Sequence, residues 1–275
     1  MKKVYLFLAL AIPVMASAQL LEVASTQRVA SNADAKVAAF SPNGDYLLLT
    51  NTSNQGLQHF DLASQKVTPI TSADGAGYNV QIAQDGNEVV YREVVTDAKQ
   101  VRTSNIVRHN LVAAKSQVVA KSQRSLEAMV ADANRPAFSV KDQQLMMTKN
   151  GKTIVFSPNG TQYSYHWASL SPNGKKVAYY VSAVGCFVCD IDGKNVQFIA
   201  HSCYAPVWYN DNIIIASDTK DNGEVILESA IVAYSLDGKK QVLTNGEQIA
   251  VFPQATAGKI AYSTSEGEIY VMNIK

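Results

Sequence analysis

A short phrase recurs along this chain and constrains its fold more than any other feature of the sequence. It consists of an aromatic or apolar residue, the tetrapeptide Ser-Pro-Asn-Gly and an apolar run. Intact copies are Phe40–Gly44 before Tyr46–Leu49 and Leu170–Gly174 before Val177–Tyr180. Weaker copies lie at Ile82–Gly86, Phe138–Asp142, Trp208–Asp211 and Ala257–Gly258. Six copies at intervals of 32 to 56 residues indicate a repeat architecture.

Each repeat predicts four short strands. The Pro-Asn-Gly turn supplies the glycine that a positive φ requires, so it joins the first strand to the second. A polar loop, a third strand, a second turn such as Asp237–Gly238 and a fourth strand follow. Four strands in a period of about 40–45 residues are typical of a β-propeller blade. On this spacing, Phe138–Asp142 ends the first strand of the third repeat, and Ser157–Gly160 falls between its third and fourth strands.

The last repeat holds only three strands before Lys275. The segment Leu20–Ala30 is the one unassigned β-like stretch, and adding it as the missing strand would close the ring without exposed edges. We therefore predict an all-β fold, a six-bladed β-propeller of four-stranded antiparallel blades in a single domain, residues 19–275. Five or seven blades stay open because the intervals vary. The stretch 115–135 allows a helical turn or a long loop.

The N-terminus has the pattern of a secretory signal peptide. Met1-Lys2-Lys3 precedes an apolar run that ends near Met15 and an Ala-Ser-Ala cleavage site at 16–18. The run is shorter than the roughly 20 residues that span a bilayer, although an uncleaved anchor is the alternative. The first cysteine is Cys186, so we expect no lipid anchor. The prediction is a periplasmic or secreted protein that is not membrane-spanning, with signal peptide 1–18.

Composition excludes several classes of function. The chain has 24 basic and 23 acidic residues, a net charge of +1, which excludes a nucleic-acid binder driven by bulk charge. Its 47% hydrophobic and 17% charged residues exclude intrinsic disorder.

The three cysteines, Cys186, Cys189 and Cys203, lie close together in the sequence. Three thiols cannot all pair in one chain, so Cys203 pairs with Cys186 or with Cys189, or all three are buried thiols. A redox pair would need a helix N-terminus rather than a strand, and the spacing with His201 matches no common zinc site. We predict no metal and no cofactor.

The repeat resembles the WD-repeat-like β-propeller motif of TolB and of the N-terminal propellers of the dipeptidyl peptidase IV and prolyl oligopeptidase families. The residues that carry the resemblance are Phe40–Gly44, Ser171–Gly174 with Val177–Tyr179, and Ile269–Asn273. It covers essentially the whole chain after residue 18 and implies the fold rather than the function. The peptidases carry their catalytic serine in a separate α/β-hydrolase domain, so we expect no serine peptidase activity.

Motifs of catalysis are missing from the sequence, which contains no Gly-x-Ser-x-Gly, His-Glu-x-x-His or P-loop pattern. We therefore predict no catalytic residues and a non-catalytic module that binds a ligand, with a protein or peptide of the cell envelope as the expected partner. The loops that lead into each first strand meet at one end of the central channel, here called the channel mouth. The candidate ligand-binding residues there are Lys36, Tyr78, Asn134, Arg135, Tyr165, His166, His201 and Tyr204. The alternative is a propeller enzyme, a lyase or hydrolase, that uses His166 and Arg135 at the same mouth. Trp167 and Trp208 are expected to pack within or beside first strands.

Overall fold

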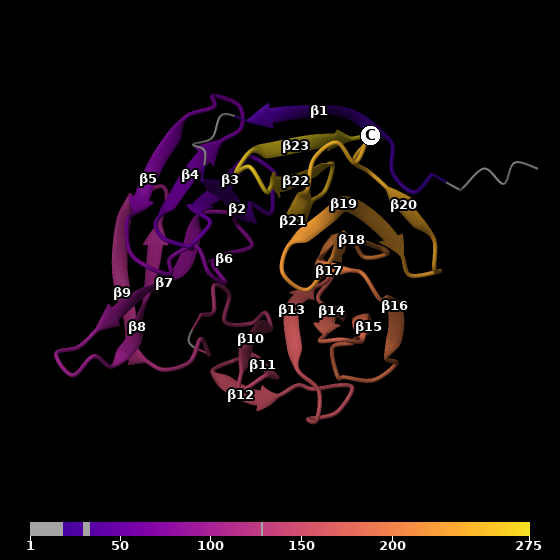
Figure 1. Cartoon of the computed structure of the whole chain (residues 1–275). Helices are drawn as coiled ribbons and strands as arrows, with labels where there is room; N and C mark the ends of the chain where they lie inside the picture. Colours follow the sequence, from indigo (N-terminus) through magenta and orange to yellow (C-terminus); the bar gives the residue numbers. More distant parts are fainter. Residues whose placement is uncertain (1–18, 30–33, 128) are drawn as a thin grey trace, which may run out of the picture.

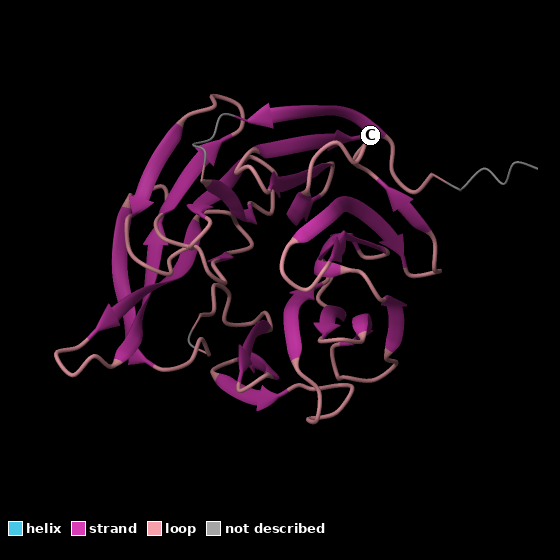
Figure 2. Ribbon diagram, viewed as in Figure 1, coloured by secondary structure: helices cyan, strands magenta, loops and turns pink. Residues whose placement is uncertain are grey.

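The computed structural model describes residues 19–29, 34–127 and 129–275, and within these ranges the chain forms strands, turns and loops without a helix (Figure 2). Accordingly, none of the described residues belongs to a helix that could cross a membrane. The predicted signal peptide, residues 1–18, and Ala30 lie outside the described residues.

Six antiparallel sheets surround a central channel, which confirms the predicted six-bladed β-propeller (Figure 1). The first blade contains β2 (Ala35–Phe40), β3 (Tyr46–Asn51), β4 (Leu57–Asp61) and β5 (Val67–Thr71). The second contains β6 (Gln81–Ile82), β7 (Glu88–Thr96), β8 (Arg102–Asn110) and β9 (Lys115–Gln123). The third contains β10 (Ala137–Lys141), β11 (Gln144–Lys149) and β12 (Lys152–Val155).

In each blade the strands are given from the innermost to the outermost, and the second half of the ring follows the same order. The fourth blade contains β13 (Tyr165–Leu170), β14 (Lys176–Val181), β15 (Gly185–Asp190) and β16 (Gln197–Ala200). The fifth contains β17 (Tyr204–Asn210), β18 (Ile213–Asp221), β19 (Ile226–Ser235) and β20 (Lys240–Val242). The sixth contains β21 (Ala250–Thr256), β22 (Lys259–Thr264), β23 (Ile269–Ile274) and, from the other end of the chain, β1 (Val23–Val29).

The Ser-Pro-Asn-Gly turn has a local reason for its sequence. Ser41 is fully buried, and its hydroxyl accepts hydrogen bonds from the backbone N–H groups of Asp45 and Tyr46, at 2.9 and 3.0 Å. Gly44 has φ 76°, which a side chain would strain. The serine therefore closes the turn that the glycine permits, and the apolar β3 follows directly.

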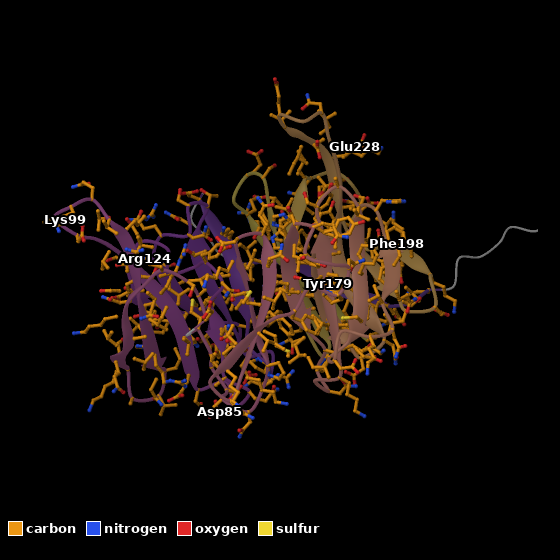
Figure 3. The ribbon with its side chains drawn as sticks, turned by 90° about the horizontal axis from the view of Figure 1, so that it is seen from below. Asp85, Lys99, Arg124, Tyr179, Phe198 and Glu228 are labelled. Carbon is orange, nitrogen blue, oxygen red and sulfur yellow. The ribbon has the colours of Figure 1, made fainter. Side chains whose placement is uncertain are left out.

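The inner turns, which join the first and second strands of each blade, form a closed ring of hydrogen bonds from blade to blade. Asp85, in the second of these turns, lies at the opposite end of the molecule from Glu228 in Figure 3. Each contact joins neighbouring blades at 2.7 to 3.2 Å: Tyr46 Oη to Gly86 O, Gln84 N to Asp132 Oδ2, Arg135 Nη2 to Ser171 O, Asn173 N to Asp211 Oδ1, Gly258 N to Tyr209 Oη, and Thr256 Oγ1 to Pro42 O. We call this set the turn ring.

The third blade differs from its predicted register. Arg135, just before β10, belongs to the turn ring, whereas Gln143, just after β10, accepts a hydrogen bond from the backbone N–H of Tyr165 at the opposite end of the channel. β10 thus runs in the direction of a second strand rather than a first. The irregular segments 124–127 and 129–131 take the inner position, and residues 132–135 form the inner turn.

Two physical features explain why the strands of the third blade differ from the predicted register. The turn at 132–135 has no glycine and no Ser-Pro, so the repeat phrase does not reveal it, although the N–H of Arg135 bonds to Asp132 O at 3.1 Å. The Phe138–Asp142 copy lies instead in β10 and in its turn to β11. Met129 and Ala131 are buried against Ala83 and Ile106 of the second blade, although they pair with no strand. The third sheet therefore has three strands, and Ser157–Gly160 lies in the connection from β12 to β13.

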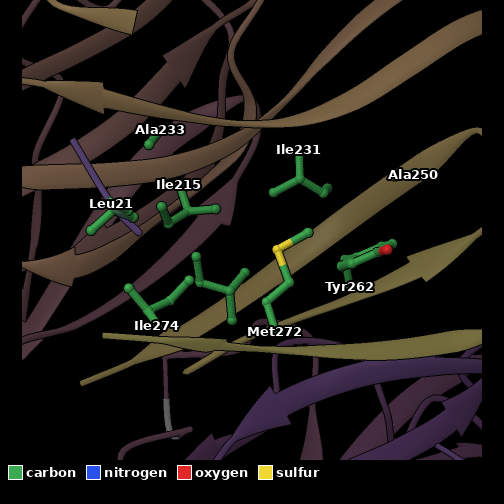
Figure 4. Close-up of a cluster of buried hydrophobic side chains, with 9 residues drawn as sticks. Leu21, Ile215, Ile231, Ala233, Ala250, Tyr262, Met272 and Ile274 are labelled. Carbon is green, nitrogen blue, oxygen red and sulfur yellow. The ribbon is translucent and has the colours of Figure 1, made fainter. Parts of the chain in front are cut away.

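The N-terminal segment closes the ring, as predicted. β1 pairs antiparallel with β23, from Val23 opposite Ile274 to Val29 opposite Ile269. Leu21 is 6% exposed and enters the core between the fifth and sixth blades, where it joins Ile215, Met272 and Ile274 (Figure 4). Leu21 and β1 thus join the N-terminal part of the described chain to the fifth and sixth blades, which are built from its C-terminal part.

Candidate functional site

A cavity of about 780 Å³ occupies the end of the central channel opposite the turn ring. It is lined by residues of all six blades, most of them at or near the starts of the inner strands. Its chemically distinctive residues are Lys36, Asn54, Tyr78, Asn79, His166, Trp167, Phe252 and Gln254. A cavity of this volume, mainly apolar with a few polar groups, suits a small ligand or a short segment of a larger one.

Irregular backbone in the inner strands shapes this cavity. Trp167, Ala205 and Phe252 have φ values of 47°, 50° and 52°, in the left-handed region. Each lies where the pairing of an inner strand with the second strand shifts register, in β13, β17 and β21. Such bulges redirect side chains, and the left-handed region is costly for bulky residues and concentrates at functional sites.

Three aromatic side chains stay exposed around the cavity. Tyr78, Trp167 and Phe252 are 46%, 42% and 43% exposed and come from the second, fourth and sixth blades. Because these blades alternate around the ring, the three rings approach the channel from three sides. Trp167 is held edge-on by Tyr180 and Tyr204, with ring centroids 5.6 and 6.0 Å away.

Two cationic groups lie over these aromatic rings. Lys36 Nζ is 5.5 Å from the centroid of the Phe252 ring and 3.4 Å from Thr52 O. The guanidinium carbon of Arg92 is 4.6 Å from the centroid of the Tyr78 ring. Burial lowers the pKa values of Lys36 and Arg92 from their usual ranges. Among the described residues that line the cavity, none is Asp or Glu.

The structure brings some predicted site residues together and separates others. Lys36, Tyr78 and His166 line the cavity, and Tyr204 supports Trp167 from behind. Tyr165 is fully buried, and its hydroxyl donates to Gly160 O.

The remaining three predicted residues lie away from the cavity. His201 is exposed, with Nδ1 at 2.9 Å from Val184 O and its ring against Phe198. Asn134 and Arg135 belong to the inner turn of the third blade, at the opposite end of the channel, because the register of that blade differs from the predicted one. Arg135 lines a second cavity of about 280 Å³ there, beside Asp132.

Sequence reasoning missed Phe252, Asn54 and Gln254 as cavity residues. Trp167 was expected to pack beside a first strand, and it does contact Tyr180, but its bulged backbone leaves the ring exposed. A signal was available in the dipeptides Ala205-Pro206 and Phe252-Pro253, because proline inside a strand marks a bulge or an edge.

The cysteines form free, buried thiols rather than a bridge. Burial, with the adjacent Cys203 thiol, raises the pKa of Cys186, and burial raises that of Cys189 to about 12. Across the described part of the chain, no three His, Cys, Asp or Glu side chains gather as a metal site.

Comparisons with known proteins identify the fold. No family model and no curated protein matches the sequence. TolB from Acinetobacter baumannii has 16% identity and a TM-score of 0.61 over 83% of this chain and 59% of that chain. This chain thus spans less than two thirds of that protein.

Two further structures match a larger share of their own length. A putative TolB from Agrobacterium tumefaciens has 15% identity and a TM-score of 0.60 over 90% of this chain and 92% of that chain. An oligogalacturonate lyase from Vibrio parahaemolyticus has 11% identity and a TM-score of 0.51 over 85% of this chain and 76% of that chain. These likenesses confirm the predicted TolB-like β-propeller fold.

Proposed function

We propose that this protein is an exported, non-catalytic binding module that holds a ligand in the cavity at the channel mouth. The observation that carries the proposal is the exposure of Tyr78, Trp167 and Phe252 around one cavity. About half of the surface of each ring is in contact with water. A ligand that covered these rings would gain part of the roughly 1.5–3 kcal/mol that full burial of one such side chain contributes. Two of the three rings lie on left-handed backbone, which is costly and marks them as more than packing residues.

Export is part of the same proposal. The signal-like residues 1–18 support it, as does the TolB-like fold. Sequencing the N-terminus of the protein recovered from the periplasm or medium tests it, with Gln19 as the expected first residue. Recovery of the intact Met1 form in the membrane fraction would instead indicate an uncleaved anchor.

A thermal-shift screen of the exported protein against peptides, sugars, nucleotides and metals tests the binding function. A ligand at 100 times its Kd stabilises the folded state by about 2.7 kcal/mol. The shift should shrink in Trp167→Ala and Phe252→Ala. It should persist in Phe198→Ala, which removes a ring of equal exposure, 43%, on the outer strand β16. A ligand shift that survives both cavity substitutions would contradict the proposed site.

The alternative, a propeller lyase or hydrolase, draws on two observations. One structural neighbour is an oligogalacturonate lyase, and His166 places an imidazole at the cavity. Turnover of a bound ligand that His166→Ala abolishes would favour this alternative over a binding module.

A further inference from the structure

The electrostatic character of the channel mouth is set by cationic side chains that lack acidic partners. Neither Lys36 nor Arg92 belongs to an ion pair within the described residues, whereas nine other basic side chains each pair with a carboxylate. Within the part of the chain that the structure describes, the one hydrogen-bond partner of Lys36 Nζ is the carbonyl of Thr52, at 3.4 Å, and that of Arg92 Nε is the carbonyl of Gly75, at 3.3 Å. Both cations therefore keep unused hydrogen-bond donors.

The surroundings of these two cations strengthen the local positive charge. Arg102, at the start of β8, lies close enough to Arg92 to disfavour its charged form electrostatically. Asp34, two residues before Lys36 in the sequence, accepts a hydrogen bond from the Thr52 hydroxyl and forms no ion pair with Lys36. A half-buried positive region of this kind is screened less than an exposed one.

The position of the cations relative to the rings indicates the shape of the ligand. Lys36 lies over Phe252, and Arg92 lies over Tyr78, so each cation is next to an exposed aromatic face. A ligand ring that stacks in the cavity would bring a substituent within reach of the Lys36 amine, which lines the cavity. Asn54, Asn79 and Gln254 add amide groups, which bond a neutral or anionic polar edge equally well.

We propose that the channel mouth recognises a ligand that carries an anionic group, a carboxylate or a phosphate, on an aromatic or other ring-shaped body. Lys36, which lines the cavity, holds the anion, Arg92 adds positive potential from its place over the Tyr78 ring, and the ring of the ligand lies against the exposed aromatic side chains. A cationic ligand is disfavoured, because two of the three exposed rings, Tyr78 and Phe252, already have cations over them and no carboxylate lines the described part of the cavity. This inference rests on the proposed function and adds the chemical class of the ligand.

Tryptophan fluorescence measures the charge of the mouth directly. Trp167 is 42% exposed at the cavity and Trp208 is 4% exposed, so ionic quenchers reach the first and spare the second. A local potential of about +1 kT per unit charge would raise the iodide concentration next to Trp167 about threefold and lower the caesium concentration there about threefold. Iodide should therefore quench more strongly than caesium at low salt. The difference should decrease in Lys36→Gln and Arg92→Gln, and persist in Lys115→Gln on the exposed outer strand β9.

Binding of small probes tests the ligand class. Benzoate and phenyl phosphate are titrated against benzamide and benzylamine, with Trp167 emission as the signal and calorimetry as a second readout. We expect the two anions to bind at least tenfold more tightly than benzamide, and Lys36→Gln or Arg92→Gln to remove that preference. The stronger of benzoate and phenyl phosphate identifies the anionic group.

The outcomes separate this inference from the proposed function. Equal affinity for benzamide and benzoate, unaltered in both charge variants, would overturn the anionic class while leaving an aromatic binding site. Tighter binding of benzylamine would also overturn it. Failure of every ring-bearing probe, neutral or charged, together with a screen in which no ligand shift depends on Trp167 or Phe252, would overturn both.

Discussion

Gln241 provides a clasp that holds the N-terminal segment to the fifth blade, and removing it should weaken closure of the ring. Its Oε1 accepts hydrogen bonds from the backbone N–H groups of Leu20 and Leu21, at 2.7 and 2.9 Å, and its Nε2 donates to Leu21 O at 2.9 Å. A net hydrogen bond contributes roughly 0.5–1.5 kcal/mol. Gln241→Ala should therefore lower the free energy of unfolding by about 2–4 kcal/mol.

Leu21→Ala should weaken the attachment of the same segment by removing packing contacts rather than hydrogen bonds. The side chain is 6% exposed against Met272 and Ile274, and truncating a buried leucine costs about 2–5 kcal/mol. Since both substitutions release the same segment, the double variant should lose less than the sum of the two single losses.

Urea unfolding followed by fluorescence measures these losses. With an m-value of about 3 kcal/mol/M, a loss of 3 kcal/mol lowers the midpoint by about 1 M. Gln197→Ala is the matched control, because the Gln197 amide donates a single bond to Leu236 O at 2.7 Å. If Gln241→Ala lowers the midpoint no more than Gln197→Ala, the clasp does not stabilise the ring, and closure depends on the pairing of β1 with β23 alone.

Three further predictions concern acid, backbone strain and thiols. A hydrogen bond from Tyr270 lowers the pKa of Glu268 in the folded protein. The ionised carboxylate therefore stabilises the fold above the ordinary glutamate pKa of 4.5, and this contribution is lost as pH falls through the folded-state pKa. Glu268→Gln should flatten the acid side of the curve of stability against pH. Ala205→Gly should leave stability unchanged or raise it by up to about 1 kcal/mol, because glycine relieves the left-handed φ of 50°. A thiol reagent at pH 8 should label neither Cys186 nor Cys189 in the folded protein, since burial raises both pKa values, and should label all three cysteines in urea.

Each of these predictions has a result that contradicts it. An acid transition identical in Glu268→Gln would show that the folded-state pKa of Glu268 equals the unfolded one. A loss in Ala205→Gly as large as that in Ala178→Gly, which lies in the regular strand β14 and should cost about 1 kcal/mol, would contradict the strain argument. One labelled thiol in urea, rather than three, would mean that two cysteines are bridged.

Part of the candidate site was predictable from the sequence. Residues of the regular blades were placed correctly, and residues of the irregular third blade were not. Lys36 and His166 were placed at the cavity because the first and fourth blades carry intact Ser-Pro-Asn-Gly turns, from which counting back along the inner strand is safe. Asn134 and Arg135 were placed at the wrong end of the channel for the opposite reason. The copy of the phrase at Phe138–Asp142 lies in β10 and its turn to β11, rather than in the inner turn at 132–135, so the count began from the wrong strand.

The sequence by itself determined the six repeats, every inner turn except that of the third blade, and the closure of the ring. These follow from local chemistry, since a turn glycine and an apolar run act over a few residues and recur along the chain. Only the tertiary structure decided which aromatic side chains face the cavity and which cations lack partners. The bulges that expose Trp167 and Phe252 lie between the first and second strands of one blade, where they interrupt the repeated pairing, and the contact of Lys36 with Phe252 joins two blades that are far apart in the sequence. The residue type at the bulge changes from blade to blade, as Trp167, Ala205 and Phe252 show, so neither feature leaves a periodic trace in the sequence.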